Sequence, residues 1–190
     1  MATQANPFVS VDEYLEREAN SLDRHEYLNG EIFLMAGGTL EHSAIATNVS
    51  AALVSQLADT DCVVRGSDAR LRTSPTGLYS YADVVVSCGQ EQSEKNTLIN
   101  PVLIVEVLSE GTENYDRGQK FELYRQIESF REYLVIAQDR VYVEHHRRDE
   151  SLHTQWTMRV FTGREDVISL SAVPAQLRMV DIYRKVLLGA

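Results

Sequence analysis

The sequence predicts an α+β or mixed α/β fold in which helices accompany one central sheet. Apolar residues recur at helical spacing in several separated segments, and alternating or β-branched runs fill much of the remaining chain. No internal repeat or Pro/Gly-rich linker divides the 190 residues. Because 44% of the residues are apolar, the chain can form a sizeable core, and residues 1–190 are expected to be a single domain.

The first third of the chain predicts two helices separated by a hairpin. The segment 9–18, "VSVDEYLERE", is expected to be a short helix with Ser10 as its N-cap. Asn29 and Gly30 stand between alternating apolar positions and both tolerate the positive φ of a type I′ turn, so they predict a two-residue hairpin. A longer helix is expected in 39–59, where apolar residues recur at helical spacing: Ile45, Val49, Ala52, Leu53 and Leu57.

The rest of the chain predicts mainly strands. They are expected in 62–73, 78–88, 101–109, 131–148 (two strands and a tight turn), 153–162 and 166–171. A polar connector covers 89–100. Helical spacing returns in 114–127, and a last short helix is expected from Met179 to Leu187.

Charge and cysteine content restrict the functional classes. The 18 basic and 28 acidic residues give a net charge of −10, which has the wrong sign for a protein that coats polyanions. A local basic site or a metal-assisted site remains compatible with it. The chain shows neither a leader peptide nor an apolar stretch of roughly 20 residues, so a cytoplasmic protein without membrane contact is expected. Cys62 and Cys88 lack metal-site spacing and are expected to be reduced, partly buried thiols.

The segment "PVLIVEVLS" carries a carboxylate inside a strand that should be buried on both faces. Strand alternation places Ile104, Glu106 and Leu108 on one face of this strand. Burial of an unpaired carboxylate costs several kcal/mol, so a cation should lie nearby or Glu106 should be protonated.

A second acid opens the preceding β-branched run. Asp83 begins "DVVVSC", so two successive strands each contribute one carboxylate to an apolar setting. A hard divalent metal held by Asp83, Glu106, a backbone carbonyl and waters would compensate both charges. The alternative is that each acid points to the sheet edge or pairs with an arginine.

A lysine on the following helix supplies a third candidate. Lys120 starts an i, i+3, i+4, i+7 stripe that continues with Leu123, Tyr124 and Ile127, so its side chain should face the sheet near Glu106. The chain has 15 arginines and three lysines, and lysine is the compact charge whose pKa shifts when it is desolvated. The alternative is a surface i, i+4 pair with Asp116.

These residues resemble those of a known family. Asp83, Glu106 in "VEVLS" and "YDRGQKFELYR", together with "HEYLNGEIFLMAGG" and "EHSAIATNVSAAL", are similar to the Uma-type endonucleases of the PD-(D/E)XK restriction-endonuclease-like superfamily. The resemblance runs from about Phe8 to Tyr183. It implies a restriction-endonuclease-like core, with a central mixed sheet flanked by helices.

The resemblance also implies a site. Asp83 and Glu106 would bind Mg²⁺ or Mn²⁺ with the Val107 carbonyl, and Lys120 would position or activate water for phosphodiester hydrolysis in nucleic acid, with DNA expected. Two positions depart from the superfamily pattern. Ala82 replaces the usual proline, and Leu108 replaces the lysine two residues after the glutamate, so Lys120 is the natural substitute.

Several further polar residues are weaker candidates. Glu31 resembles a family position and could add a third carboxylate, or it could be an exposed hairpin acid. His42 could contact a phosphate or a leaving group, or it could cap or pack its helix. His145 and His146 point to opposite faces of one strand and are expected at the surface or in an oligomer contact.

The leading hypothesis is therefore a Mg²⁺-dependent endonuclease that acts on nucleic acid, expected as a homo-oligomer, a dimer. The alternative is a catalytically inactive module with a nuclease fold that serves binding or assembly. A hydrolase of small phosphate esters would use the same metal chemistry.

Overall fold

The computed structural model describes residues 8–35, 37–152 and 154–188, and it confirms the α+β class. The helices are α1 (Val11–Ala19), α2 (Leu40–Gln56), α3 (Glu113–Tyr115), the π-helical turn η1 (Asp116–Lys120), α4 (Phe121–Tyr124) and α5 (Met179–Ile182). The strands are β1 (His25–Leu28), β2 (Glu31–Leu34), β3 (Cys62–Gly66), β4 (Arg70–Arg72), β5 (Tyr79–Tyr81), β6 (Val84–Cys88), β7 (Ser93–Glu94), β8 (Thr97–Leu98), β9 (Leu103–Leu108), β10 (Glu132–Ala137), β11 (Val143–Arg148), β12 (Trp156–Phe161), β13 (Val167–Ser169) and β14 (Gln176–Arg178).

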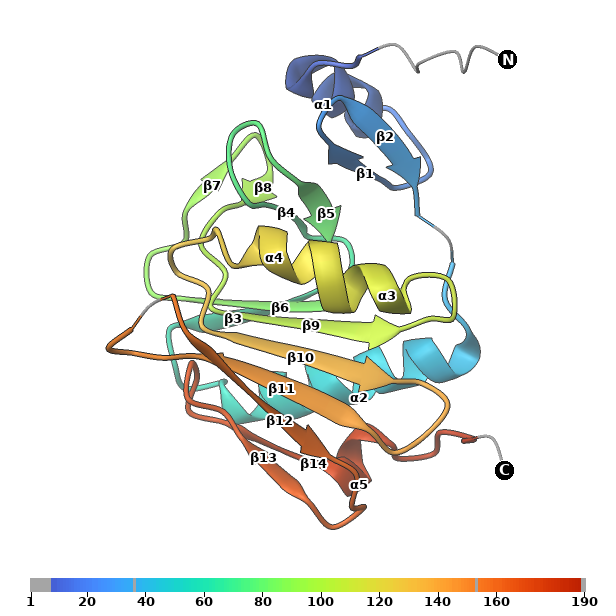
Figure 1. Cartoon of the computed structure of the whole chain (residues 1–190), viewed down its shortest axis with the longest axis vertical. Helices are drawn as coiled ribbons and strands as arrows, with labels where there is room; N and C mark the ends of the chain where they lie inside the picture. The colour runs from blue at the N-terminus through green and yellow to red at the C-terminus, as the bar shows by residue number, and fades with distance from the viewer. Residues whose placement is uncertain (1–7, 36, 153, 189–190) are drawn as a thin grey trace.

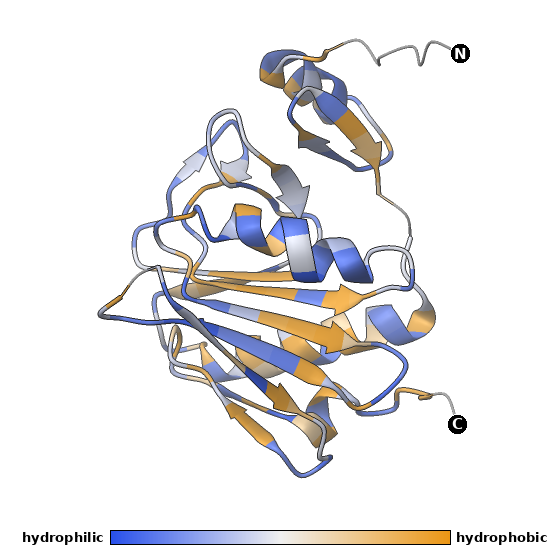
Figure 2. Ribbon diagram, viewed as in Figure 1, coloured by the Kyte–Doolittle hydropathy of each residue, from blue (hydrophilic) through white to orange (hydrophobic). Residues whose placement is uncertain are grey.

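A mixed sheet in the order β12-β11-β10-β9-β6-β3 forms the centre of the fold (Figure 1). Its β9 and β10 strands are parallel, and its other neighbouring strands are antiparallel. Helix α2 packs Ile45, Val49 and Leu53 against one face, while Phe121 and Tyr124 belong to the core on the other face. The apolar central strands in Figure 2 are therefore covered on both sides, as expected from their composition.

A second sheet, in the order β2-β1-β5-β4-β8-β7, brings the N-terminal segment to the central sheet. Ser10 is the N-cap of helix α1 and forms a capping box with Glu13. The predicted hairpin turn is present, with φ of 51° at Asn29 and 90° at Gly30. Tyr14, Tyr27 and Tyr79 form a buried aromatic cluster that holds α1 and the hairpin against β5. That residues 1–190 form a single domain stays a prediction.

The structure refines several predicted boundaries. Segments 62–73 and 78–88 each divide into two strands that belong to different sheets, and the second division falls at Asp83. The polar connector contains the short strands β7 and β8. Helix α5 ends at Ile182 and follows a strand, β14, that the sequence did not predict. Ala36 and His153, which lie in predicted motifs, are outside the described residues.

Two side-chain expectations are wrong. Cys62 and Cys88 are directly opposite in the antiparallel β3–β6 pair and form a disulfide, so they are not free thiols. His145 is buried within the chain, and its Nε2 lies 2.9 Å from Glu132 Oε1, whereas a position at the surface or in an oligomer contact was expected. Both contacts depend on strand register, which composition alone does not reveal. Within the described ranges, no helix is long and apolar enough to cross a bilayer.

Candidate active site

Glu106 lies in the middle of β9, on the face that is covered by η1 and α4. Its neighbours on that face, Ile104 and Leu108, belong to the same apolar core as Tyr124. Glu106 itself is 4% exposed, and its Oε1 accepts a hydrogen bond of 2.9 Å from the Tyr124 hydroxyl. The strand therefore buries a carboxylate as the sequence predicted, and the protein provides it with specific partners.

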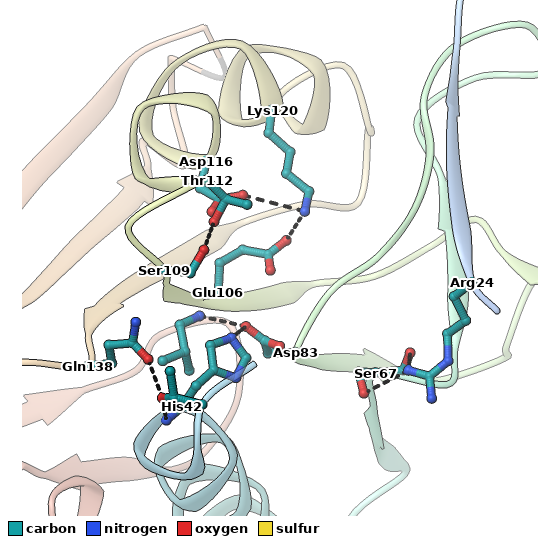
Figure 3. A network of polar contacts seen from close by, with 12 residues as sticks. Arg24, His42, Ser67, Asp83, Glu106, Ser109, Thr112, Asp116, Lys120 and Gln138 are labelled. Carbon is teal, nitrogen blue, oxygen red and sulfur yellow. Dashed lines mark hydrogen bonds and ion pairs between the residues drawn. The ribbon is translucent and has the colours of Figure 1, made fainter. Parts of the chain in front are cut away.

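Lys120 is the cation beside Glu106. Figure 3 shows its side chain extending from the helical turn toward the strand, where Nζ lies 3.0 Å from Glu106 Oε1. The same Nζ is 2.9 Å from Glu26 Oε1 and 3.5 Å from Asp116 Oδ1. The i, i+4 contact with Asp116 thus exists, but both side chains are buried rather than on the surface. The π-helical turn η1 begins with Asp116 and ends with Lys120, and such turns often mark functional sites.

Asp83 reaches the other side of Glu106 from the bend between β5 and β6. The β6–β9 register pairs Val84 with Val105, so one further step places Asp83 opposite Glu106. The backbone N–H of Val107 donates to Asp83 Oδ2 at 2.7 Å, which fixes this carboxylate against β9. The two predicted acids therefore lie opposite one another, Glu106 in β9 and Asp83 one residue before β6.

His42 approaches the same Asp83 oxygen from α2. Its Nε2 lies 3.2 Å from Asp83 Oδ2, and its backbone N–H is capped by Thr39 Oγ1 at 3.1 Å. The Thr39 hydroxyl also donates to Gln138 Oε1, at 2.7 Å, just after β10 ends. The first turn of α2 is thus anchored at the site: Thr39 caps the helix, and the His42 side chain contacts Asp83 (Figure 3).

The carboxylates outnumber the cations in this cluster. Burial raises the pKa of Glu106 to about 8, and the charges of Asp116, Asp83 and Glu26 act in the same direction, although Lys120 lowers it. Burial alone would lower the pKa of Lys120, but the surrounding carboxylates hold it well above its ordinary value. The hydrogen bond to Asp83 raises the pKa of His42 despite burial. The lysine is therefore an ammonium, in a site with an excess of negative charge.

The donor atoms fit a hard cation that keeps several waters. Within residues 8–35, 37–152 and 154–188, no group of three or more His, Cys, Asp or Glu is arranged to hold a metal by itself. Among these residues, Asp83 Oδ1 and Glu106 Oε2 have no hydrogen bond or ion pair, because the recorded contacts use Oδ2 and Oε1. Mg²⁺ commonly takes one or two carboxylates and completes its shell with water. Asp83 and Glu106 suit that mode of binding, with the Val107 carbonyl as the third expected ligand.

The hairpin contributes a different acid from the one expected. Glu31 is exposed on β2, whereas Glu26 on β1 is buried and reaches Lys120. Glu26 Oε1 is a buried oxygen without a well-directed hydrogen bond among the described residues, although Nζ lies 2.9 Å away. The signal in the sequence that could have indicated Glu26 is its place between the partly apolar neighbours His25 and Tyr27. Tyr124 was likewise not singled out as a contact of Glu106, and Asp116 was considered only as a surface partner of Lys120.

The comparisons with known proteins identify the family of this chain. Residues 11–182 match the Uma2 family, described as "Putative restriction endonuclease". The chain is 32% identical to the uncharacterized proteins slr1290 and sll1609 of Synechocystis sp.. The first match covers 94% of this chain and 93% of the relative, and the second covers 90% and 97%.

A solved structure shows the same fold. The crystal structure described as a putative nuclease belonging to DUF820 from Anabaena variabilis superposes with a TM-score of 0.76 and 17% sequence identity. The superposition covers 94% of this chain and 99% of that one. The resemblance seen in the sequence is confirmed: the chain belongs to the Uma2 family, and the activity that the description of this family supports is that of a nuclease.

Proposed function

We propose that this protein is a metal-dependent endonuclease that hydrolyses phosphodiester bonds in DNA. The observation that carries the proposal is the register of Asp83 and Glu106. Each has one oxygen held by the protein and one oxygen without a partner among the residues that the structure describes. Together with the Val107 carbonyl they would hold Mg²⁺ or Mn²⁺. The bound ion would supply a water of lowered pKa and would neutralise charge on the scissile phosphate.

Lys120 acts as a cation in this proposal. Because the carboxylates around it keep its pKa well above the ordinary value, its ammonium remains protonated and does not accept a proton from water. Its donors can instead orient the attacking water and stabilise negative charge that develops on the phosphate oxygens. Glu26 and Asp116 hold the ammonium over Glu106, so it needs little reorganisation when substrate arrives.

The remaining polar groups orient the two acids. Tyr124 holds Glu106 Oε1, while the Val107 N–H and His42 hold Asp83 Oδ2. These contacts leave the opposite oxygen of each carboxylate directed away from its protein partners. His42 is therefore a positioning residue for Asp83, rather than a direct contact of the leaving group.

The excess of carboxylates makes nucleic-acid binding dependent on cations. Glu106, Asp116 and Glu26 surround Lys120, and Asp83 lies beside Glu106, so the site repels phosphate. The net charge of −10 adds to this repulsion. We expect weak DNA binding without divalent metal and tighter binding with it.

The decisive experiment measures nicking of supercoiled plasmid with Mg²⁺, Mn²⁺ or EDTA. Nicking should require metal and should disappear in Asp83→Ala and in Glu106→Gln, while circular dichroism shows that both variants remain folded. Asp59→Ala, which changes an exposed acid distant from the site in sequence, is the matched control and should cleave normally. Cleavage undiminished in the first two variants would show that the site assignment is wrong.

Calorimetry separates this proposal from a non-catalytic module. Metal binding should give measurable heat and should raise the melting temperature of the wild-type protein. Neither effect should occur in Asp83→Ala. A wild-type protein that shows no heat and no stabilisation with either ion would favour the inactive binding or assembly module.

A further inference from the structure

The outermost strand of the central sheet, β12, has an open edge. Among the described residues it pairs only with β11, and Figure 1 shows it at the end of the sheet order. Natural proteins usually protect such edges with proline, lysine, a bulge or a very short strand. β12 has six residues, contains no proline and carries one charge, that of Arg159. β12 therefore has the features of an edge strand that can pair with a further strand.

The exposed side chains of this strand are apolar on one face. Met158 is 55% exposed and Val160 is 44% exposed, and both lie on the same face as Trp156. The register joins this face to the candidate active site, because Glu106 is opposite Val135, Val135 is opposite Glu144, and Glu144 is opposite Val160. The apolar edge and the site thus share one face of the sheet.

We propose that a second copy of this chain pairs with β12 in antiparallel orientation, around a two-fold axis at Met158. A two-fold axis perpendicular to the sheet keeps each face on its own side, so residues that oppose one another must come from the same face. With the axis at Met158, this residue meets its own copy, and Trp156 meets Val160 of the second copy. The exposed Met158 and Val160 and the half-buried Trp156 then form one continuous apolar row across the interface.

Charge favours this register over the next one. An axis at Arg159 would place two guanidinium groups directly opposite one another, and like charges in that position destabilise a strand pair. With the axis at Met158, Arg159 is opposite Thr157 of the second copy. The only charge within β12 is therefore compatible with the proposed pairing.

The pairing also determines how the candidate active sites of the two copies are oriented. The significance of this orientation rests on the proposed function. Because the axis is perpendicular to the sheet, the Glu106 and Lys120 side chains of both copies lie on the same side of one twelve-stranded sheet. A single pair of strands is at the low end of interface size, so we expect a dimer whose population depends on concentration.

Sedimentation velocity over a wide concentration range tests the interface independently of cleavage. The wild-type protein, of 21.4 kDa, should shift toward twice that mass as concentration rises. Met158→Glu places two carboxylates at the axis and should abolish the shift. Phe33→Glu is the matched control, since Phe33 is 48% exposed on β2, an edge strand of the other sheet, and it should leave the dimer intact. A monomeric wild type, or a dimer that persists in Met158→Glu, would overturn the proposal.

Disulfide trapping tests the register. Residues opposite one another in an antiparallel pair have Cα atoms about 4.5–5.5 Å apart, within the range that a disulfide spans. Under mild oxidation, Met158→Cys should cross-link two copies, whereas Val160→Cys should not, because its opposite residue is Trp156. The native cysteines are already joined in a disulfide, and the wild-type protein is the control for their exchange. Cross-linking of Val160→Cys at the rate of Met158→Cys or faster would overturn the axis position.

Discussion

The ammonium of Lys120 lies 3.0 Å from Glu106 Oε1, although the two residues belong to different elements, a helical turn and a strand. The superfamily pattern would place a lysine at position 108, two residues after the glutamate. Leu108 stands there instead, on the same face of β9 and packed in the same apolar core as Tyr124. The positive charge that β9 lacks at position 108 is supplied by Lys120, from the helical turn that covers this face of the strand.

Replacement of Lys120 should remove catalysis. We expect Lys120→Met to lower kcat for plasmid nicking by about 10²–10³-fold, because it removes a positioned donor from the developing charge. The double variant Lys120→Met/Leu108→Lys should recover part of that loss, since position 108 faces the same space. Lys95→Met, an exposed lysine paired with Asp12, is the control. A wild-type rate in Lys120→Met would contradict the role given to this residue.

The two hairpin acids should behave differently. Glu26→Gln removes one of the three carboxylates around Lys120, and we expect at least a tenfold loss of kcat. Glu31→Gln changes an exposed acid in the same hairpin and should leave both kcat and stability unchanged. Steady-state kinetics on a short fluorescent duplex, with melting curves for both variants, would measure this contrast. Equal losses in the two variants would mean that the hairpin acts as a whole and not through Glu26.

Without metal, the protein should become less stable as pH rises toward 8. Burial raises the pKa of Glu106 from its ordinary value of 4.5 to about 8, so the native state binds more protons than the unfolded state between these values. Stability therefore falls with rising pH in this window, by at most about 1.4 kcal/mol per pH unit. Urea unfolding at several pH values should show the slope, which Glu106→Gln should remove and Mn²⁺ should reduce. If the slope of stability against pH is unchanged in Glu106→Gln, a group other than Glu106 causes it.

Glu132 should limit stability in acid. Burial would raise its pKa, but hydrogen bonds from His145, Ala172 and Ser171 outweigh burial and lower it. A lowered pKa stabilises the native state above the ordinary value of 4.5, and this stabilisation is lost as pH falls through the lower native pKa.

Substitution tests that assignment. Glu132→Gln should cost about 2–3 kcal/mol at neutral pH, because the Ser171 and Ala172 donors lose a charged acceptor, and it should flatten the acid limb of the stability curve. Glu150→Gln, an exposed acid, is the control for the change in net charge. An acid limb unchanged in Glu132→Gln would assign acid unfolding to other carboxylates.

The sequence could predict those parts of the site that depend on local periodicity. Alternation along β9 predicted that Glu106 lies on a core face, and helical spacing predicted that Lys120 faces it. In the structure Glu106 is buried, and the Lys120 ammonium lies beside it. Glu26 was not predicted, because the docking of the hairpin depends on the tyrosine cluster, which joins residues far apart in the chain. Glu31 is the exposed hairpin acid of the alternative interpretation. The Cys62–Cys88 pair depends on the register of β3 and β6, and periodicity does not fix register between strands.

The parallel pairing of β9 and β10 explains why a lysine can serve this site from a helix. Parallel neighbours cannot be joined by a tight turn, so the chain must cross a face of the sheet between them. Here the crossing consists of α3, η1 and α4, which pass over the face that carries Glu106. What identifies the lysine of this site is therefore the position of its ammonium beside Glu106, rather than a fixed number of residues after the acid. A search for similar sites by motif spacing would miss chains of this kind, whereas a search for a basic residue in the crossover after an acid-bearing strand would find them.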